Sequence, residues 1–217
     1  MSNLVLITSV IKTPDKPLSY SRTRSVFNHD ERFNQTIKTI ETIKKNIPNS
    51  KILIVECSDL NDFQESYLKK NCDYTLNLWH ENNLHDYIFG LSKSLGEGTM
   101  TIKALQYIQQ LNLEYNYLYK ISGRYWLNNN FKIENIQNNV FKKIDNNPNN
   151  IFTALYKIDK ESVNKLLYFL VNNIENMKKC IGYEVLIAHF VKNIDKKFVD
   201  IIGISGFVTV GGCEYNG

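Results

Sequence analysis

The sequence predicts an α/β domain with a mostly parallel central sheet, and three observations predict it. Short aliphatic runs alternate with segments of helical spacing along the N-terminal half of the 217-residue chain. A hydrophobic content of 43% supplies enough apolar material for a core, and a charged content of 22% is ordinary for a globular protein. Repeated strand–helix–strand units place successive strands side by side in parallel. We therefore expect a single domain over residues 1–217, with helices flanking the sheet and an antiparallel hairpin in the second half.

The N-terminal half is predicted to alternate strands and helices. The run LVLITSVI at 4–11 reads as a buried strand, and apolar residues at helical spacing predict a helix from about 30 to 46. Further predicted elements are a strand at 51–57, a helix capped by Ser58 and Asp59, a strand at 73–79, a helix at 99–113 and a strand at 117–122.

The second half has a different pattern. The run VFKKI at 140–144, the turn DNNPNN and the run at 151–158 predict an antiparallel hairpin. Two helices, at about 159–174 and 181–192, are expected after it. The segment FVDIIGISGFVTVGG then predicts two short strands broken by Gly203 and Gly206.

Composition and charge narrow the class of function. The net charge of +4 fits a small anionic ligand, and no block of Lys and Arg resembles a nucleic-acid-binding tail. No run reaches the roughly 18 apolar residues of a membrane span, and the start MSNLVLITSV lacks a basic region, so we expect neither a span nor a signal peptide. The four cysteines are scattered without a CxxC pair, which favours reduced thiols and a cytoplasmic protein.

Arginine is scarce in this chain and unevenly placed. There are four arginines beside 22 lysines: Arg22, Arg24 and Arg32 follow the first strand, and Arg124 follows the strand at 117–122. Carboxyl ends of parallel strands meet at one edge of a sheet, where ligands bind. A planar guanidinium contacts phosphate in a bidentate manner that an ammonium cannot reproduce. We predict a phosphate site there. The alternative is that these arginines pair with nearby acids such as Asp15, Asp30 and Glu31.

A second group of candidate residues lies in LSKSLGEGTMTIKAL at 91–105. Gly96 and Gly98 flank Glu97 just before the predicted helix, whose N-terminus attracts an anion. The spacing is not that of a Walker A loop. Lys93 is a candidate phosphate ligand. Glu97 is expected either to bind a hydroxyl group or to cap the helix.

A third candidate is Glu184, in the first turn of the predicted helix at 181–192. An acid there is stabilised by the helix dipole, which is a sufficient structural reason for it. The alternative is a carboxylate facing the cleft, as a base or as an anchor for a hydroxyl group. The sequence leaves both interpretations open.

These pieces together resemble a known family. Their order, with the strings "PLSYSRTRSVFNHDERFNQTIKTIETIKKNIPNSKILIVE" and "YLYKISGRYWL", resembles GT-A-type nucleotide-sugar glycosyltransferases, in particular small glycosyltransferase-like proteins of large DNA viruses and bacterial surface-polysaccharide loci. The resemblance implies a GT-A-like (Rossmann-like) fold, with a nucleotide-binding half at 1–125 and an acceptor-side half at 126–217. It implies a nucleotide sugar as donor and a glycan or another hydroxyl compound as acceptor, in the cytoplasm, or in the host cytoplasm for a viral protein.

The chain departs from that family at one position. The strand corresponding to YLYKI usually ends in Asp-x-Asp, which holds a divalent metal such as Mn or Mg on the diphosphate. Here that position reads Ser122-Gly123-Arg124, and no Asp-x-Asp occurs in the sequence. Metal dependence is therefore in doubt. We expect Arg124, with Lys120, to neutralise the diphosphate in place of a metal.

The resemblance and the residue patterns together give one predicted site. Arg22, Arg24, Lys120 and Arg124 would bind the diphosphate, and Gly123 would permit close approach. Glu184 would be the base in an inverting reaction or would orient the acceptor in a retaining one. The rest of the predicted pocket is Lys93, Gly96, Glu97, Ser122 and Tyr125.

Two other functions stay open from the sequence. One is a non-catalytic nucleotide- or sugar-binding module of a larger polysaccharide-assembly protein. The other is nucleotidyl transfer, which the sequence disfavours because residues 9–25 lack the Gly-rich basic loop of such enzymes.

Overall fold

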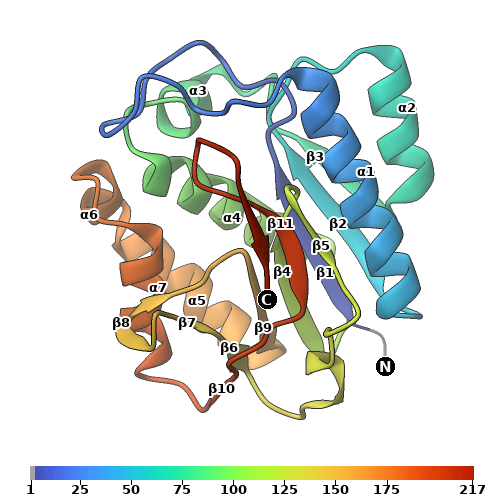
Figure 1. Ribbon diagram of the computed structural model, residues 1–217, viewed down its shortest axis with the longest axis vertical. Helices are drawn as coiled ribbons and strands as arrows, with labels where there is room; N and C mark the ends of the chain where they lie inside the picture. The colour runs from blue at the N-terminus through green and yellow to red at the C-terminus, as the bar shows by residue number, and fades with distance from the viewer. Residues whose placement is uncertain (1–2) are drawn as a thin grey trace.

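The computed structural model describes residues 3–217 and confirms the predicted α/β class. Its centre is a seven-stranded sheet in the order β10-β6-β9-β4-β1-β2-β3, in which β9 alone runs antiparallel to its neighbours (Figure 1). The strands of this sheet are β1 (Leu4–Ser9), β2 (Lys51–Glu56), β3 (Tyr74–Asn77), β4 (Tyr117–Ser122), β6 (Val140–Phe141), β9 (Leu155–Asp159) and β10 (Lys197–Phe198).

The three central strands are aliphatic because both of their faces are covered. Every residue of β1 is buried, and β1 pairs in parallel with β2 and with β4, so that Leu4 lies opposite both Lys51 and Leu118. Parallel strands covered on both faces show continuous apolar runs of this kind. This explains why the strand predictions at 51–57 and 117–122 were accurate.

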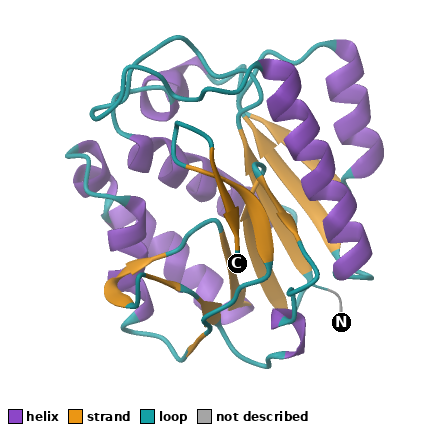
Figure 2. Cartoon of the chain, viewed as in Figure 1, coloured by secondary structure: helices purple, strands orange, loops and turns teal. Residues whose placement is uncertain are grey.

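Helices and a small second sheet cover the two faces (Figures 1 and 2). One face packs on α1 (His29–Asn46), α2 (Asp62–Asn71) and the sheet β12-β11-β5, and the other packs on the remaining helices. Those helices are α3 (Asn82–Ile88), α4 (Lys93–Gln110), α5 (Lys160–Asn172), α6 (Ile174–Lys178) and α7 (Tyr183–Val191); a single 3-10 turn, η1 (Ile133–Asn135), follows β5.

Two predicted helix starts were wrong. Helix α2 is capped by Asn61, whose side chain accepts from the backbone N–H of Gln64, not by Ser58 or Asp59. Helix α4 begins at Lys93, six residues before the predicted Thr99, because the Ser92 side chain caps it by accepting from Leu95.

The glycines that suggested a loop before Thr99 lie inside α4. A Cβ atom at Gly96 would come 2.6 Å from the Ile88 carbonyl oxygen, and one at Gly98 would collide with the Met177 side chain. Close packing on α3 and α6 therefore requires these glycines, and Glu97 lies on the first turns of a helix instead of before it.

The hairpin predicted at 140–158 is divided between two sheets. Strands β6 and β9 join the central sheet, where Val140 lies opposite Lys157. A smaller hairpin forms from β7 (Lys143–Ile144) and β8 (Asn147–Ile151). Asp145 and Asn146 make its two-residue turn, with φ of 49° and 56° as the tightest hairpins require.

The C-terminal segment holds more strand than predicted. Strand β11 (Ile204–Val208) continues through Gly206 and pairs with β12 (Cys213–Asn216) and with β5 (Tyr125–Leu127). Of the two glycines predicted to break the strands, only Gly203, with φ of 81°, lies outside strand structure. Among residues 3–217, no helix is long and apolar enough to cross a membrane.

The order of the strands creates a crevice. From β1 the chain builds β2 and β3 on one side and then returns to place β4 on the other side of β1. The loops after Ser9 and Ser122 therefore diverge between neighbouring strands. Such switch points are where open α/β sheets bind ligands.

Candidate active site

A two-lobed cleft lies at the carboxyl ends of β1 and β4. The small lobe has a volume of about 140 Å³ and lies between the end of β1 and the junction of α3 with α4. The large lobe has a volume of about 720 Å³ and extends toward α7 and the β7–β8 hairpin. Both lobes share one wall, made of Lys93, Glu97, Ser122, Arg124 and Val210.

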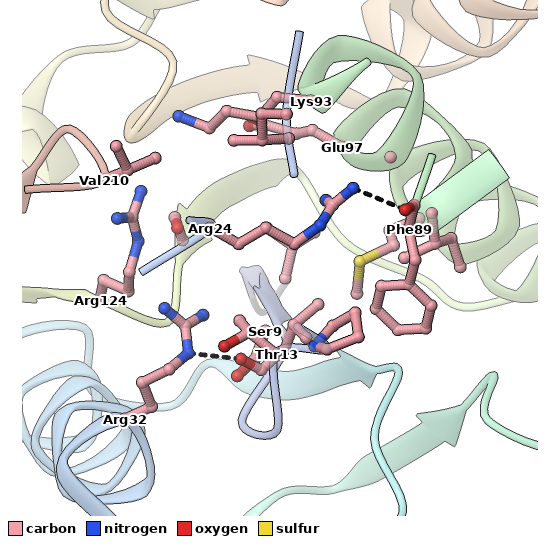
Figure 3. Close-up of a pocket in the computed structure, with 17 residues that line it drawn as sticks. Ser9, Thr13, Arg24, Arg32, Phe89, Lys93, Glu97, Arg124 and Val210 are labelled. Atoms are coloured by element: carbon pink, nitrogen blue, oxygen red, sulfur yellow. Dashed lines mark hydrogen bonds between the residues drawn. The ribbon is translucent and has the colours of Figure 1, made fainter. Parts of the chain in front are cut away.

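Three of the four arginines share the small lobe. Arg24, Arg32 and Arg124 come from three separate segments and line it together with Lys93 (Figure 3). Arg22 is exposed and lines neither lobe, whereas Arg32, which was not among the predicted site residues, lines the small lobe. Within residues 3–217 no arginine forms an ion pair with an acidic side chain, which leaves their charge available to an anion.

Arg32 was missed as a site residue because it lies in the first turn of α1. Asn28 caps that helix in a capping box with Glu31, which sets Arg32 one residue further on. Its Nε donates to the Val10 carbonyl at 2.6 Å, and its side chain is directed into the small lobe (Figure 3). Burial, with repulsion from Arg124, lowers the pKa of Arg32 to about 10, so it stays cationic at neutral pH.

Arg24 lies in the lobe but also holds the loop together. Its guanidinium donates to the carbonyls of Lys16 (3.1 Å), Pro17 (3.4 Å), Phe89 (2.6 Å) and Gly90. These bonds fasten the long loop at 12–28 to the end of α3. Most of the N–H donors of Arg24 are therefore occupied by the protein itself, and Arg24 would stabilise a bound anion mainly through its charge.

Arg124 and Lys93 face each other on the shared wall. One guanidinium nitrogen of Arg124 donates to the Thr209 carbonyl at 3.1 Å, and the group lies 5.8 Å from the centre of the Tyr125 ring. Lys93 makes no ion pair and no side-chain hydrogen bond within residues 3–217. Burial, and then repulsion from Arg124, lowers the pKa of Lys93. Glu97 and Glu184 partly offset this repulsion, but neither cation forms an ion pair, and a bound anion would stabilise both.

Lys120 does not reach the cleft, which corrects its predicted role as a diphosphate ligand. It is fully buried, with its Nζ 2.5 Å from Glu97 Oε1 and 3.1 Å from the Thr153 carbonyl oxygen. Burial alone would raise the pKa of Glu97, but Lys120 overrides this effect and lowers it. Glu97 is thus a fixed carboxylate on the shared wall and does not cap α4.

Glu184 lines the large lobe from the first turn of α7, and a smaller pocket brings it together with Lys93 and Glu97. Burial raises the pKa of Glu184, and repulsion from Glu97 raises it further. The two carboxylates of the cleft are therefore driven apart in pKa: Glu97 is held ionised and Glu184 binds its proton more tightly. Such a separation is typical of sites that divide binding and proton transfer between two acids.

The other predicted residues are spread over the cleft and its supports. Ser122 lies on the shared wall, Gly96 lines the small lobe, and Tyr125 lines the large lobe. Gly123 is buried and lines neither lobe. A Cβ there would lie 3.1 Å from Ser9 Oγ, so the close approach it permits is between β4 and the end of β1.

The donor set of the cleft does not fit a divalent metal. Among residues 3–217, no three His, Cys, Asp or Glu side chains cluster in a way that could hold a metal ion. Where the resembling family places Asp-x-Asp, this chain places Arg124, and the nearest carboxylate, Glu97, is paired with Lys120. We therefore derive no step through a metal.

Comparison with known proteins adds a likeness of fold. No protein-family model matches the chain, and no curated protein matches its sequence. A solved structure of the CTP:phosphocholine cytidylyltransferase LicC from Streptococcus pneumoniae is similar, with a TM-score of 0.55 and 11% identity over 95% of this chain and 94% of that chain. At this level of identity the likeness shows the fold: a mixed α/β, Rossmann-like domain with a mostly parallel sheet.

Proposed function

We propose that this protein is a glycosyltransferase that moves a sugar from a nucleotide-sugar donor to a glycan or another hydroxyl acceptor. The observation that carries the proposal is the meeting of Arg32, Arg124 and Lys93 at the switch point between β1 and β4, where none of the three forms an ion pair within residues 3–217. Guanidinium and ammonium groups at the carboxyl ends of such strands are suited to a diphosphate. The resemblance of the sequence to GT-A enzymes supports the same donor.

The two lobes of the cleft differ in their lining residues, which supports a separate binding partner for each lobe. The small lobe combines cations with apolar side chains such as Ile88, Phe89 and Met100, which suits a nucleobase beside its phosphates. The diphosphate then lies against Arg124 and Lys93 on the shared wall. The large lobe receives the sugar and the acceptor, and the rings of Tyr125, Phe152 and Tyr215 give it an aromatic wall suited to sugars.

The proposed reaction breaks the bond between the anomeric carbon and the diphosphate oxygen and forms a bond to the acceptor oxygen. The nucleoside diphosphate leaves with the electron pair, and its new charge is stabilised by Arg124 and Lys93. Glu184, with its raised pKa, takes the proton of the acceptor hydroxyl if the configuration inverts. In a retaining reaction Glu184 orients the substrate. Glu97, kept ionised by Lys120, accepts a hydrogen bond from a substrate hydroxyl.

Nucleotidyl transfer is a second candidate, which the likeness of fold to a cytidylyltransferase favours. The same cations would then hold a nucleoside triphosphate, and pyrophosphate would leave. The loop at 9–25 argues against it, because it contains no glycine to bring its backbone close to a triphosphate.

One assay separates the candidates by their products. The protein is incubated with a panel of nucleotide sugars and, separately, with nucleoside triphosphates and sugar phosphates, with and without Mn²⁺. Release of nucleoside diphosphate that increases with added glycan supports glycosyl transfer. Release of pyrophosphate assigns nucleotidyl transfer instead, and binding without turnover of either kind assigns a non-catalytic module.

A further inference from the structure

We propose that the small lobe selects pyrimidine nucleotides over purine nucleotides. The inference rests on the proposed function, because it assumes that a nucleobase occupies this lobe. It adds the class of base, which neither the resemblance nor the likeness of fold determines.

The size of the lobe is the first argument. Its volume is about 140 Å³. An engineered apolar cavity of about 150 Å³ in another protein holds one benzene molecule. The small lobe is open toward the large lobe, and the volume between its own walls matches a single six-membered ring, whereas the second, fused ring of a purine would extend beyond that volume.

The apolar wall of the small lobe is part of the packed core. Ile88, Phe89 and Met100 are each no more than 5% exposed and belong to the main core of the α4 face. The Phe89 ring packs against Trp79 and His85, with centroid separations of 6.3 Å and 5.6 Å. Making room for a larger base would disturb this packing, and forcing extra atoms into a packed core is unfavourable.

Polar groups at the end of β1 complete the site. Thr8 and Thr13 line the small lobe, and neither side chain makes a hydrogen bond within residues 3–217. The Ser9 hydroxyl, by contrast, is already paired with Thr36 at 3.2 Å. The two hydroxyl groups can form hydrogen bonds with the polar edge of a base, while the apolar wall contacts the flat face of the same ring.

The test is a binding titration of the intact protein with UDP, CDP and dTDP against GDP and ADP. We expect the pyrimidine nucleotides to bind roughly tenfold or more tightly than the purine nucleotides. Met100→Ala, which enlarges the lobe, should reduce that ratio severalfold. Met177→Ala is the matched control, since Met177 is equally buried and contacts the same helix at Gly98 but lines neither lobe. It should leave the ratio unchanged.

Two results would overturn the inference. Purine nucleotides that bind as tightly as pyrimidine nucleotides would remove the size selection while leaving the proposed function intact. An unchanged ratio in Met100→Ala would show that this wall does not contact the base. Absence of binding by all five nucleotides would instead contradict the proposed function itself, and the inference with it.

Discussion

Lys120 and Glu97 form an ion pair, with Nζ 2.5 Å from Oε1, that joins the central strand β4 to helix α4 under the cleft. The ammonium is fully buried and lies about equally far from the rings of Tyr156 and Tyr183, at 6.0 Å and 5.9 Å. Lys120 therefore positions a carboxylate of the cleft without lining the cleft itself, and its charge also acts to lower the pKa of Lys93 and of Glu184.

Removal of Lys120 should be strongly destabilising. Lys120→Met leaves the Glu97 carboxylate without its partner, and breaking a buried pair in this way costs about 3–5 kcal/mol. Lys103→Met is the control. Lys103 lies on α4, the helix that carries Glu97, and pairs with Glu81, but both of these side chains are partly exposed, at 32% and 41%. That change should cost less than about 1 kcal/mol. Urea unfolding measures both, and equal losses would contradict the structural role of Lys120.

The same pair sets the direction of a pH effect on stability. Because the folded pKa of Glu97 is lowered, the unfolded chain binds this proton more tightly. The stabilisation from Glu97 is complete above the ordinary glutamate pKa, about 4.3, and is lost as the pH falls through the lowered folded value. Unfolding over this range should show a smaller loss of stability on acidification in Glu97→Gln than in the wild type, because only the contribution of Glu97 is removed and the other acidic residues remain.

Arg124 should not be replaceable by lysine. Arg124→Lys keeps the charge but loses the planar fork, so donor affinity should fall by about 1.5–3 kcal/mol, roughly tenfold to a hundredfold. Arg22→Lys is the matched control, since Arg22 is exposed and outside both lobes. Calorimetric titration with the nucleoside diphosphate measures both variants. An unchanged affinity in Arg124→Lys would remove this residue from the site.

Glu184→Gln should reduce turnover while sparing binding. Loss of a general base lowers rates by roughly two to four orders of magnitude, whereas the neutral amide preserves the shape of the large lobe. Steady-state kinetics with the preferred donor and acceptor measure the split between kcat and KM. Full activity in this variant would show that Glu184 is not the base and serves only as an acid stabilised by the dipole of α7.

The pH profile provides an independent check on Glu184. Its pKa is raised, so the base becomes active only above the usual glutamate range, and the rate should rise with pH through that raised value. The acidic limb of kcat/KM should disappear in Glu184→Gln. If the acidic limb of kcat/KM persists unchanged in this variant, the titrating group is another residue.

Arg24 should act mainly on the order of the long loop. Arg24→Lys cannot make the four carbonyl contacts that fasten residues 16–18 to the end of α3, so the loop should open more often. Hydrogen exchange measured by mass spectrometry should accelerate in residues 12–28 and remain unchanged in β2. Equal exchange in both forms would show that the loop is held by other contacts, such as the backbone bond from Ser19 to Leu91.

Most of the fold could be predicted from the sequence because its signals are local. Continuous aliphatic runs identify β1, β2 and β4, and apolar periodicity identifies α1 within one residue of its true start. The start of α4 could not be predicted in this way. Gly96 and Gly98 resemble a loop in sequence, and only the packing of Ile88 and Met177 against them explains their place in a helix.

The position of the candidate site in the sheet could be predicted from the sequence more readily than the residues that line it. The carboxyl ends of β1 and β4 follow from topology alone, and Arg24, Arg124, Lys93, Glu97 and Glu184 all line the cleft there. The exchange of Arg22 for Arg32 depends on the path of the loop at 12–28, which leaves Arg22 exposed, and on the orientation of α1, which directs Arg32 into the small lobe. The burial of Lys120 depends on Glu97, a partner 23 residues away that sequence spacing does not reveal.

The central claim is that a diphosphate rests against Arg124 and Lys93 where β1 and β4 diverge. A crystal of the protein soaked with UDP tests it most directly. We expect both phosphates within hydrogen-bonding distance of Arg124 and Lys93, with the base in the small lobe beside Phe89 and Met100. UDP bound at another face of the protein, or a diphosphate that contacts neither cation, would contradict it.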